Sequence, residues 1–448
     1  MNQKHLDDFY SFLRFRSIST DDHYRDEVLR CAEWLVRRLH RIGLRTELVR
    51  TDKHPIVWGR TPHDPTKRTV LIYGHYDVQP PDPLELWESP PFEPVLKNGY
   101  VFARGATDNK GQVLAHILAV EETLQELGQL PVNLHFVVEG EEEIGSVSLE
   151  RFLRQNRDAL RSDVAVVSDS EMLARGVPTL AYGLRGLAAL EVKVTGPRID
   201  LHSGLFGGAV ANPITALAQL LATVHDREGH VAVRGFYDQV TPLEDWERDE
   251  WKKLPVNADK EILHESGSPA LFGEKGFSTF ERLWARPTVE LNGISGGYEG
   301  VGTKTVIATS AMAKITCRLV PQQEPAEILR LLEEHLRGHL PDGVELGITG
   351  GHTGPWYLMN PNSQSGLAAQ KALREAFGGE KVALVRGGGS IPIVSAFREI
   401  LGAESLLLGL GLPDCRMHSP NENFPMANLE AGIRLNQVLL RELAAQQA

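Results

Sequence analysis

Histidines and carboxylates gather at five places in this sequence, each just after an expected strand or in a glycine-rich turn. In an open α/β sheet, ligands bind outside the carboxyl ends of the strands, so residues far apart in sequence can converge there. Taken singly, each place is more typical of a turn, a helix cap or a solvated acidic face. Their joint occurrence favours a functional site. The five places are Gly74–Asp77, Gly105–Gly111, Glu139–Ser146, Ser168–Ser170 and Met417–Pro420.

Charge decides what could hold these residues together. Asp108, Asp169 and a glutamate in one dry crevice would repel one another, which would raise their pKa values unless cations neutralise them. Together with His75 and His418 they form a mixed nitrogen and oxygen set that suits Zn²⁺ or Mn²⁺. Asp108 could bridge two ions, because a carboxylate spans the roughly 3.5–4 Å between paired metals. The residues therefore either hold two divalent ions or lie scattered.

Two neighbouring pairs suggest how such a site would work. Asp77 follows His75 by two positions and could accept the second ring N–H of a metal-bound histidine. Glu142 and Glu143 are adjacent, and neighbours on an extended segment face different ways. One of them could bind a metal while the other takes a proton from a water whose pKa the metal lowers toward about 7.

Composition limits the class of protein. The chain has 448 residues, 42% of them hydrophobic and 24% charged, which excludes disordered, collagen-like and coiled-coil proteins. Its net charge of −12 disfavours nucleic acid as a partner. Cys31, Cys317 and Cys415 form no disulfide framework, and no signal peptide or membrane-length apolar run is evident. We expect a cytoplasmic protein with no membrane or nucleic-acid partner.

The elements that must position these residues alternate between strand and helix in the first part of the chain. Val28, Leu35 and Leu39 belong to one apolar helical stripe, and the run 69–73 is typical of a fully buried strand. This alternation predicts an α/β domain with a mostly parallel sheet. The expected elements are a helix over 26–42, strands over 69–73, 133–138 and 164–168, and helices over 110–127 and 147–160.

The pattern changes near Gly186 and returns near Ser363. Leu187–Thr195 alternates apolar and polar residues as a half-exposed strand does, and Asn212-Pro213 opens a helix. Two long helices between antiparallel-looking strands predict a separate α+β domain. We therefore expect residues 1–185 and 357–448 to form one domain that is interrupted by a smaller one over 186–356.

The order His-x-Asp, Asp, Glu-Glu, Asp, His resembles the dinuclear zinc metallopeptidase and aminoacylase family, and within it the carnosine-dipeptidase branch. The resemblance implies a three-layer catalytic domain with a mostly parallel sheet, and an inserted α+β domain, ferredoxin-like with two layers, for dimerisation and as a lid. The segments that carry it are Gly74–Pro80, Arg104–Gly111, Glu142–Ser146, Asp200–Gly204, Arg318–Pro321 and Gly388–Pro392.

The resemblance also implies a role for each residue of the motifs. Each subunit would hold two divalent metal ions, Zn²⁺ or alternatively Mn²⁺. Asp77 would orient a histidine ligand, Glu142 would be the general base, and the Asp108–Asn109 peptide bond would be cis. The ligands would be His75 and Asp169 for one metal, Glu143 and His418 for the other, and Asp108 between them.

The inserted domain would supply the residues that contact substrate. The resemblance implies a homodimer in which His202 reaches the partner subunit's active site and stabilises the oxyanion. Arg318 would bind the free carboxylate of the substrate with its planar guanidinium, and Ser390 would help to hold it. Thr305 and His352 are further candidates for the same pocket.

The implied activity is metal-dependent hydrolysis of dipeptides or short peptides with a free C-terminal carboxylate, by a water that two metals activate. One alternative is an N-acyl-amino-acid amidohydrolase that uses the same site, and another is a non-catalytic scaffold with this fold. The sequence departs from the family at Arg386-Gly387, where Arg-Glu is common. This change removes a charge near the expected substrate pocket.

Overall fold

The computed structural model describes residues 2–446, which divide into two compact units. Unit 1 contains the described residues up to Tyr182, Met359–Val385 and the described residues from Pro392 onward. Unit 2 contains Gly183–Leu358 and Arg386–Ile391. The chain therefore leaves unit 1 and returns to it twice.

A mixed sheet forms the centre of unit 1. Of the nine strands that this sheet has among the described residues, seven are β1 (Arg45–Val49), β2 (Ile56–Arg60), β3 (Thr69–His75), β6 (Asn133–Glu139), β7 (Val164–Val167), β8 (Thr179–Leu184) and β17 (Glu404–Leu407). They lie in the order β1-β2-β6-β3-β7-β17-β8. The four central strands β6, β3, β7 and β17 pair in parallel, as the alternation of strands and helices predicts. Antiparallel pairs extend the sheet on both sides.

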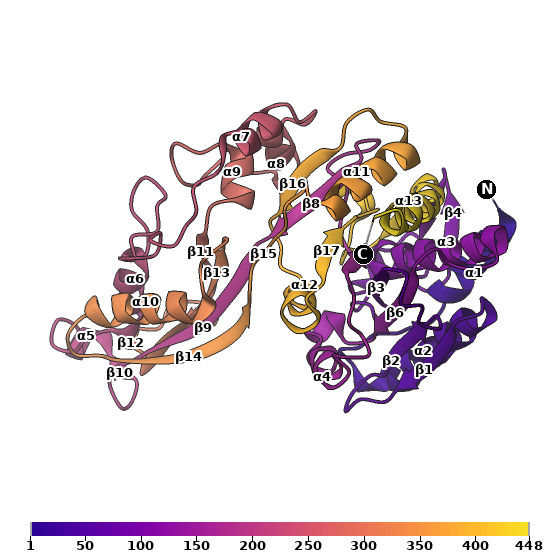
Figure 1. Ribbon diagram of the computed structural model, residues 1–448. Helices are drawn as coiled ribbons and strands as arrows, with labels where there is room; N and C mark the ends of the chain where they lie inside the picture. The colour runs from indigo at the N-terminus through magenta and orange to yellow at the C-terminus, as the bar shows by residue number, and fades with distance from the viewer. Residues whose placement is uncertain (1, 447–448) are drawn as a thin grey trace. The chain divides into compact units, whose positions relative to one another are not determined.

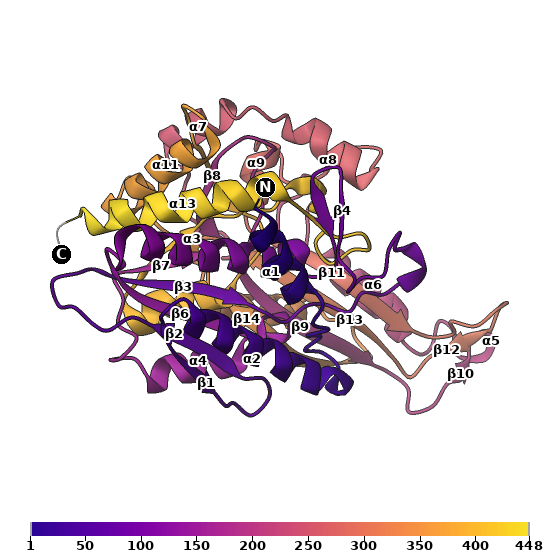
Figure 2. The same cartoon turned by 90° about the vertical axis from the view of Figure 1, so that its right-hand side faces the viewer.

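Helices cover this sheet. They are α1 (Gln3–Leu13), α2 (Arg25–Arg41), α3 (Gln112–Leu127), α4 (Val147–Gln155), α11 (Gln364–Phe377), α12 (Pro392–Ala396) and α13 (Met426–Ala444). Figure 2 shows α13 and α3 side by side along the sheet, and α11 packs against α13. The predicted stripe of α2 is buried and lies against β1 and β2. Short strands β4 (Val95–Lys97), β5 (Tyr100–Phe102) and β18 (Asn423–Pro425) form a small separate sheet.

Unit 2 is built on a four-stranded antiparallel sheet with two helices on one face (Figure 1). Its elements are β9 (Gly186–Thr195), α6 (Pro213–Ala222), β11 (Thr288–Gly296), β13 (Ser310–Leu319), α10 (Pro325–Gly338) and β14 (Glu345–Gly354). The sequence of elements, βαββαβ, and the strand order β11-β13-β9-β14 are those of a ferredoxin-like fold. Every second residue of β9, from Ala188 to Val194, is buried against α6 and α10, as the alternation predicts.

The segment between α6 and β11 holds three helices for which the sequence analysis made no prediction. They are α7 (Asp245–Lys252), α8 (Ala258–Ser266) and α9 (Thr279–Trp284). Capping boxes start α7 and α9, and Trp251 packs edge-on against Trp284. Within residues 2–446, no helix is both long and apolar enough to cross a bilayer.

Candidate active site

The parallel strands of unit 1 end level with one another at one edge of the sheet. His75 at the end of β3 lies opposite Glu139 at the end of β6, and Tyr73 lies opposite Val167 at the end of β7. Leu407 at the end of β17 also pairs with Val167. The segments that follow these strands therefore start side by side. Predicted site residues at or just after these ends are His75, Glu142, Glu143 and Asp169.

One group of potential metal ligands surrounds His75. Its Nε2 atom lies 3.0 Å from Oδ1 of Asp108 and 3.5 Å from Oδ1 of Asp169. One ligand atom from each of the three residues lies within 4.8 Å of the others. The amide of Asn109 donates to Oδ1 of Asp169 at 2.9 Å and to the carbonyl of Ser168 at 2.6 Å. Asn109 thereby fixes the direction in which the Asp169 carboxylate points.

A second group shares Asp108 with the first. Nε2 of His418 lies 2.8 Å from Oδ2 of Asp108 and 3.4 Å from Oε2 of Glu143. These three ligand atoms also lie within 4.8 Å of one another. Each oxygen of Asp108 thus faces a different group, and the structure brings all five predicted ligands together. Oε1 of Glu143 is buried without a hydrogen-bond partner among residues 2–446, and Gln79 donates to Oε2 at 2.7 Å.

The two histidines carry the positive charge that these carboxylates require. Burial alone would lower the pKa of His75, but Asp169 and Asp108 raise it well above its usual value. Hydrogen bonds that His418 donates to Asp108 and, to a lesser extent, to Glu143 raise its pKa to about 10. These raised pKa values favour protonated histidines beside the carboxylates when no metal is bound. Because divalent cations satisfy the same donor atoms, this mixed nitrogen and oxygen set fits two ions such as Zn²⁺.

Glu142 lies beside the ligands without belonging to either group. It is in the turn Glu142–Ile144 that follows β6. Burial raises its pKa well above the usual value, and the charges of Asp169 and Glu143 add to this effect. A carboxyl group with a raised pKa next to a metal site suits a general base.

Asp77 contacts His75, which the resemblance implies that it orients, and several other groups as well. Nδ1 of His75 lies 3.1 Å from the backbone oxygen of Asp77 and 3.4 Å from its carboxylate. The carboxylate accepts the hydroxyl of Ser19 at 2.7 Å and the backbone N–H groups of Glu142 and Glu143 at 3.3 and 3.1 Å. Asp77 therefore connects the end of β3 to the turn that carries both glutamates.

Several residues that fix the positions of the candidate ligands were not predicted from the sequence. Asn109 follows Asp108 in the segment Arg104–Gly111, and Gln79 lies near His75 in the segment Gly74–Pro80. Their positions in the sequence could therefore have indicated a role beside the candidate ligands. The Asp108–Asn109 peptide bond is cis, as the resemblance implies. Ser19 and Glu422 lie in no motif that was singled out, and only the folded chain brings them to the site.

Two of the substrate-binding candidates contact each other in unit 2. Arg318 near the end of β13 donates from Nη1 to Oγ of Ser390 at 3.0 Å. Ser390 in turn donates to the carbonyl of Arg185 at 2.5 Å. Burial and the nearby Arg318 lower the pKa of Arg185 to about 10. Two guanidinium groups close together form a place where an anion would be favoured.

The other candidates of unit 2 lie on exposed segments. His202 ends the short strand β10 (Leu201–His202), and its Nδ1 accepts the backbone N–H of Gly204 at 3.0 Å, which is a capping role. The carbonyl of Thr305 accepts the N–H of Ser203 at 3.1 Å, so Thr305 lies next to the His202 segment. His352 is on β14, within an irregularity of its pairing with β9.

The departure at Gly387 occurs in a tightly packed strand, β16 (Ala383–Gly387). A Cβ atom added to Gly387 would lie 2.7 Å from a methyl group of Leu184. The preceding Arg386 is buried and forms an ion pair with Glu247 of α7, which is also buried. A carboxylate from α7 thus balances the charge of Arg386 inside unit 2.

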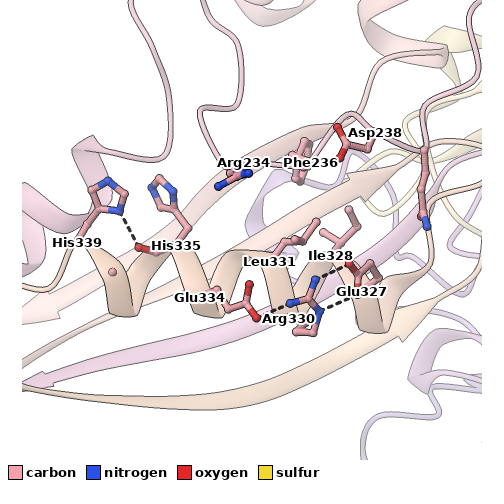
Figure 3. Close-up of a pocket in the computed structure, with 13 residues that line it drawn as sticks. Arg234, Phe236, Asp238, Glu327, Ile328, Arg330, Leu331, Glu334, His335 and His339 are labelled. Carbon is pink, nitrogen blue, oxygen red and sulfur yellow. Dashed lines mark hydrogen bonds and ion pairs between the residues drawn. The ribbon is translucent and has the colours of Figure 1, made fainter.

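Unit 2 contains a cavity of about 590 Å³ that none of these residues lines (Figure 3). It lies between α10 and the segment 234–239, and no predicted site residue lines it. Its wall is highly charged, but Arg330 is already paired with Glu327 and Glu334. Both ligand groups found among residues 2–446 belong to unit 1. The size of this cavity therefore does not mark it as the catalytic site.

Comparison with known proteins gives consistent matches over the length of the chain. The model of Peptidase family M20/M25/M40 matches residues 71–442. The Cys-Gly metallodipeptidase dug1 of Schizosaccharomyces pombe is 35% identical, covering 96% of this chain and 93% of that protein. The human Beta-Ala-His dipeptidase is 33% identical, covering 98% of this chain and 91% of that protein.

Solved structures agree with these matches. The M20 family metallo-carboxypeptidase Sso-CP2 from Sulfolobus solfataricus superposes with a TM-score of 0.89 at 30% identity, covering 100% of both chains. Human carnosine dipeptidase 1 gives a TM-score of 0.83 at 31% identity, covering 99% of this chain and 96% of the other.

Proposed function

The chain belongs to peptidase family M20/M25/M40 and is a metallopeptidase, and from this premise we propose that it hydrolyses dipeptides or very short peptides with a free C-terminal carboxylate. The observation that carries the proposal is Asp108, whose two oxygens face two separate ligand groups. The names of the two curated relatives, a Cys-Gly metallodipeptidase and a Beta-Ala-His dipeptidase, support dipeptides as the substrate class.

The proposed cofactor is a pair of divalent cations that share Asp108, with Zn²⁺ preferred and Mn²⁺ as the alternative. When bound, such a pair lowers the pKa of a water molecule and polarises the scissile carbonyl. The backbone oxygen of Asp77 can only accept, so a neutral His75 donates from Nδ1 and presents the lone pair of Nε2. That tautomer suits a metal ligand, and the same reasoning makes Asp77 the residue that orients His75.

Glu142 is the proposed general base. It would take a proton from the attacking water and pass it to the leaving nitrogen. The products, a carboxylate and an amine, would then form without an unstable amide anion. Its raised pKa supports the interval between these steps, because a base of very low pKa could not hold the proton. The hydrogen bonds that the backbone N–H groups of Glu142 and Glu143 donate to Asp77 would fix the positions of the base and the ligand relative to each other.

Unit 2 would bind the substrate. Arg318 and Ser390 are proposed to hold the free carboxylate, which their direct contact supports. His202 is proposed to act in the site of a second copy within a homodimer, where it would stabilise the oxyanion. Its exposure and the exposed apolar Leu205 close by suit a contact with another chain. Thr305 and His352 remain further candidates for this pocket.

Replacing Glu142 tests the proposal. Glu142→Ala should lower kcat on a dipeptide panel by about 10²- to 10⁴-fold with metal content unchanged, which is the usual contribution of a general base. Glu150→Ala, on the exposed face of α4, is the matched control and should keep full activity. Turnover near that of the unaltered enzyme would refute the assignment of the base.

Two further measurements address the remaining alternatives. Parallel kinetics on dipeptides and N-acetyl amino acids separate a dipeptidase from a deacylase, which is not favoured by the named relatives. Membership of a peptidase family also disfavours a non-catalytic scaffold.

A fully active monomer in light scattering would refute the homodimer. The cytoplasmic location stays a prediction.

A further inference from the structure

Glu422 has an unusual environment for a carboxylate. Its side chain is fully buried, at 0% exposure, and its two carboxylate oxygens accept four hydrogen bonds from the protein. Oε2 accepts Nη1 of Arg104 at 2.8 Å and the backbone N–H of Gly105 at 2.9 Å. Oε1 accepts the backbone N–H groups of Thr107 and Asp108 at 2.8 and 3.0 Å. Three of the four donors therefore belong to the backbone of one short loop.

This loop needs an acceptor from elsewhere in the chain. The N–H groups at the start of a helical turn have no carbonyl partner within it, and the turn here is Ala106–Gly111. Burying these donors without a partner would be costly, and so would burying an unpaired carboxylate. Glu422 and the loop satisfy each other, and the buried Arg104 balances the charge. The loop is thereby held in one conformation.

The position of Glu422 in the chain connects this loop to the second ligand group. Glu422 follows His418 by four residues, so one short segment supplies both a candidate ligand and the acceptor for the backbone of Asp108. The neighbouring Asn423 adds to the connection, because its carbonyl accepts the hydroxyl of Thr107 at 2.6 Å. The His418 and Asp108 side chains that meet at 2.8 Å are therefore held from the same segment.

We propose that Glu422 is a positioning residue that fixes the shared carboxylate Asp108 between the two ligand groups and thereby sets the affinity of the site for its metal ions. The proposal rests on the proposed function, because it takes Asp108 to be the shared ligand. Glu422 itself acts through backbone N–H groups. The alternative is that Glu422 and Arg104 form an ion pair that serves only the stability of unit 1.

Glu422→Gln separates these two roles. The substitution keeps the shape but turns one oxygen into an NH₂ group, which would face N–H donors instead of accepting them. We expect the affinity for Zn²⁺ to fall by about 10- to 100-fold, the usual effect of losing a residue that supports metal ligands. The affinity is measured by titrating metal-free full-length protein with Zn²⁺ against a chromogenic chelator, and the melting temperature of the metal-free protein is recorded in parallel.

Glu121→Gln is the matched control, because Glu121 also pairs with a buried arginine, Arg38, but is not part of either ligand group. It should lower the melting temperature without changing the affinity for Zn²⁺. If Glu422→Gln binds Zn²⁺ as tightly as the unaltered chain, the positioning role is wrong. If it does not fold, Glu422→Asp replaces it, since the shorter side chain keeps the charge but cannot reach all four donors, and unchanged affinity there also refutes the role.

The outcome also separates this inference from the proposed function. Failure of the unaltered chain to bind two equivalents of Zn²⁺ or Mn²⁺ would refute the proposed function. Normal binding by the unaltered chain together with normal binding by Glu422→Gln would refute only the role of Glu422.

Discussion

The candidate residues of unit 1 and those of unit 2 are held in very different ways. In unit 1 the five candidate ligands contact one another, and buried groups such as Asp77 and Asn109 fix their directions. In unit 2, His202 and His352 are exposed, and a hydrogen bond from Arg318 to Ser390 joins two of the candidates. This difference indicates that the fold of a single chain arranges the proposed metal ligands, whereas the proposed substrate contacts of unit 2 are less fixed by the fold.

The physical cause lies in burial. A carboxylate that is removed from water must find several donors, so each buried acid of unit 1 imposes a geometry on its neighbours. An exposed histidine such as His202 can be solvated by water and therefore imposes little geometry on its neighbours. The comparison predicts large effects on metal binding from changes in unit 1 and effects on substrate binding alone from changes in unit 2.

Asp108→Asn should have the largest effect, because it weakens both ligand groups at once. We expect kcat/KM on a dipeptide to fall by about 10³-fold or more, since both ions of the proposed pair would contribute to the reaction. Metal analysis of the purified protein should find fewer than two ions per chain. Two tightly bound ions together with near-normal turnover would show that Asp108 is not shared.

Metal removal should affect unit 1 and leave unit 2 unchanged. A ligand present at 100 times its Kd stabilises the state that binds it by about 2.7 kcal/mol. Chelation should therefore lower the amide-exchange protection around the ends of β3 and β7 in hydrogen-exchange mass spectrometry. The strands β9 and β13 serve as the internal control. Equal loss of protection in both units would contradict a site that belongs to unit 1.

Arg318→Lys should raise KM for dipeptides while metal content stays at the normal level. Replacing a bidentate guanidinium by an ammonium group loses part of a charge-assisted interaction worth about 1.5–3 kcal/mol, so KM should rise about 10-fold. The effect should disappear for a substrate whose C-terminus is amidated. A change in metal content would show that Arg318 also supports unit 1.

Ser390→Ala should have the smallest effect. It removes the hydroxyl that accepts one hydrogen bond from the Arg318 guanidinium, and since a typical hydrogen bond contributes about 0.5–1.5 kcal/mol, KM should rise about 2- to 10-fold. Steady-state kinetics on the same dipeptide series would measure this. Ser363→Ala, which alters a helix cap in unit 1, is a control that should change stability and leave KM as it is.

Much of the site could be predicted because its residues follow strands that have a clear sequence pattern. The runs that form β3, β6 and β7 are apolar and branched, and parallel strands bring their carboxyl ends to one edge. The helices α7 to α9 could not be predicted, since their short, mixed segment has capping boxes but little periodicity.

The role of Glu422 could not be predicted for a different reason. Its carboxylate accepts a hydrogen bond from the backbone N–H of Asp108, which is 314 residues away in the sequence. No local sequence pattern indicates which distant loop a buried carboxylate will contact. Such partners depend on the path of the whole chain. The residues that support a site are therefore harder to predict from one sequence than the ligands, whose chemical type is itself a signal.

The most direct test of the central claim is a crystal structure of the Zn²⁺-loaded protein with anomalous data collected at the zinc absorption edge. The account predicts two peaks, one beside His75 and Asp169 and one beside Glu143 and His418, with Asp108 in contact with both. A single peak, or peaks away from these residues, would contradict it.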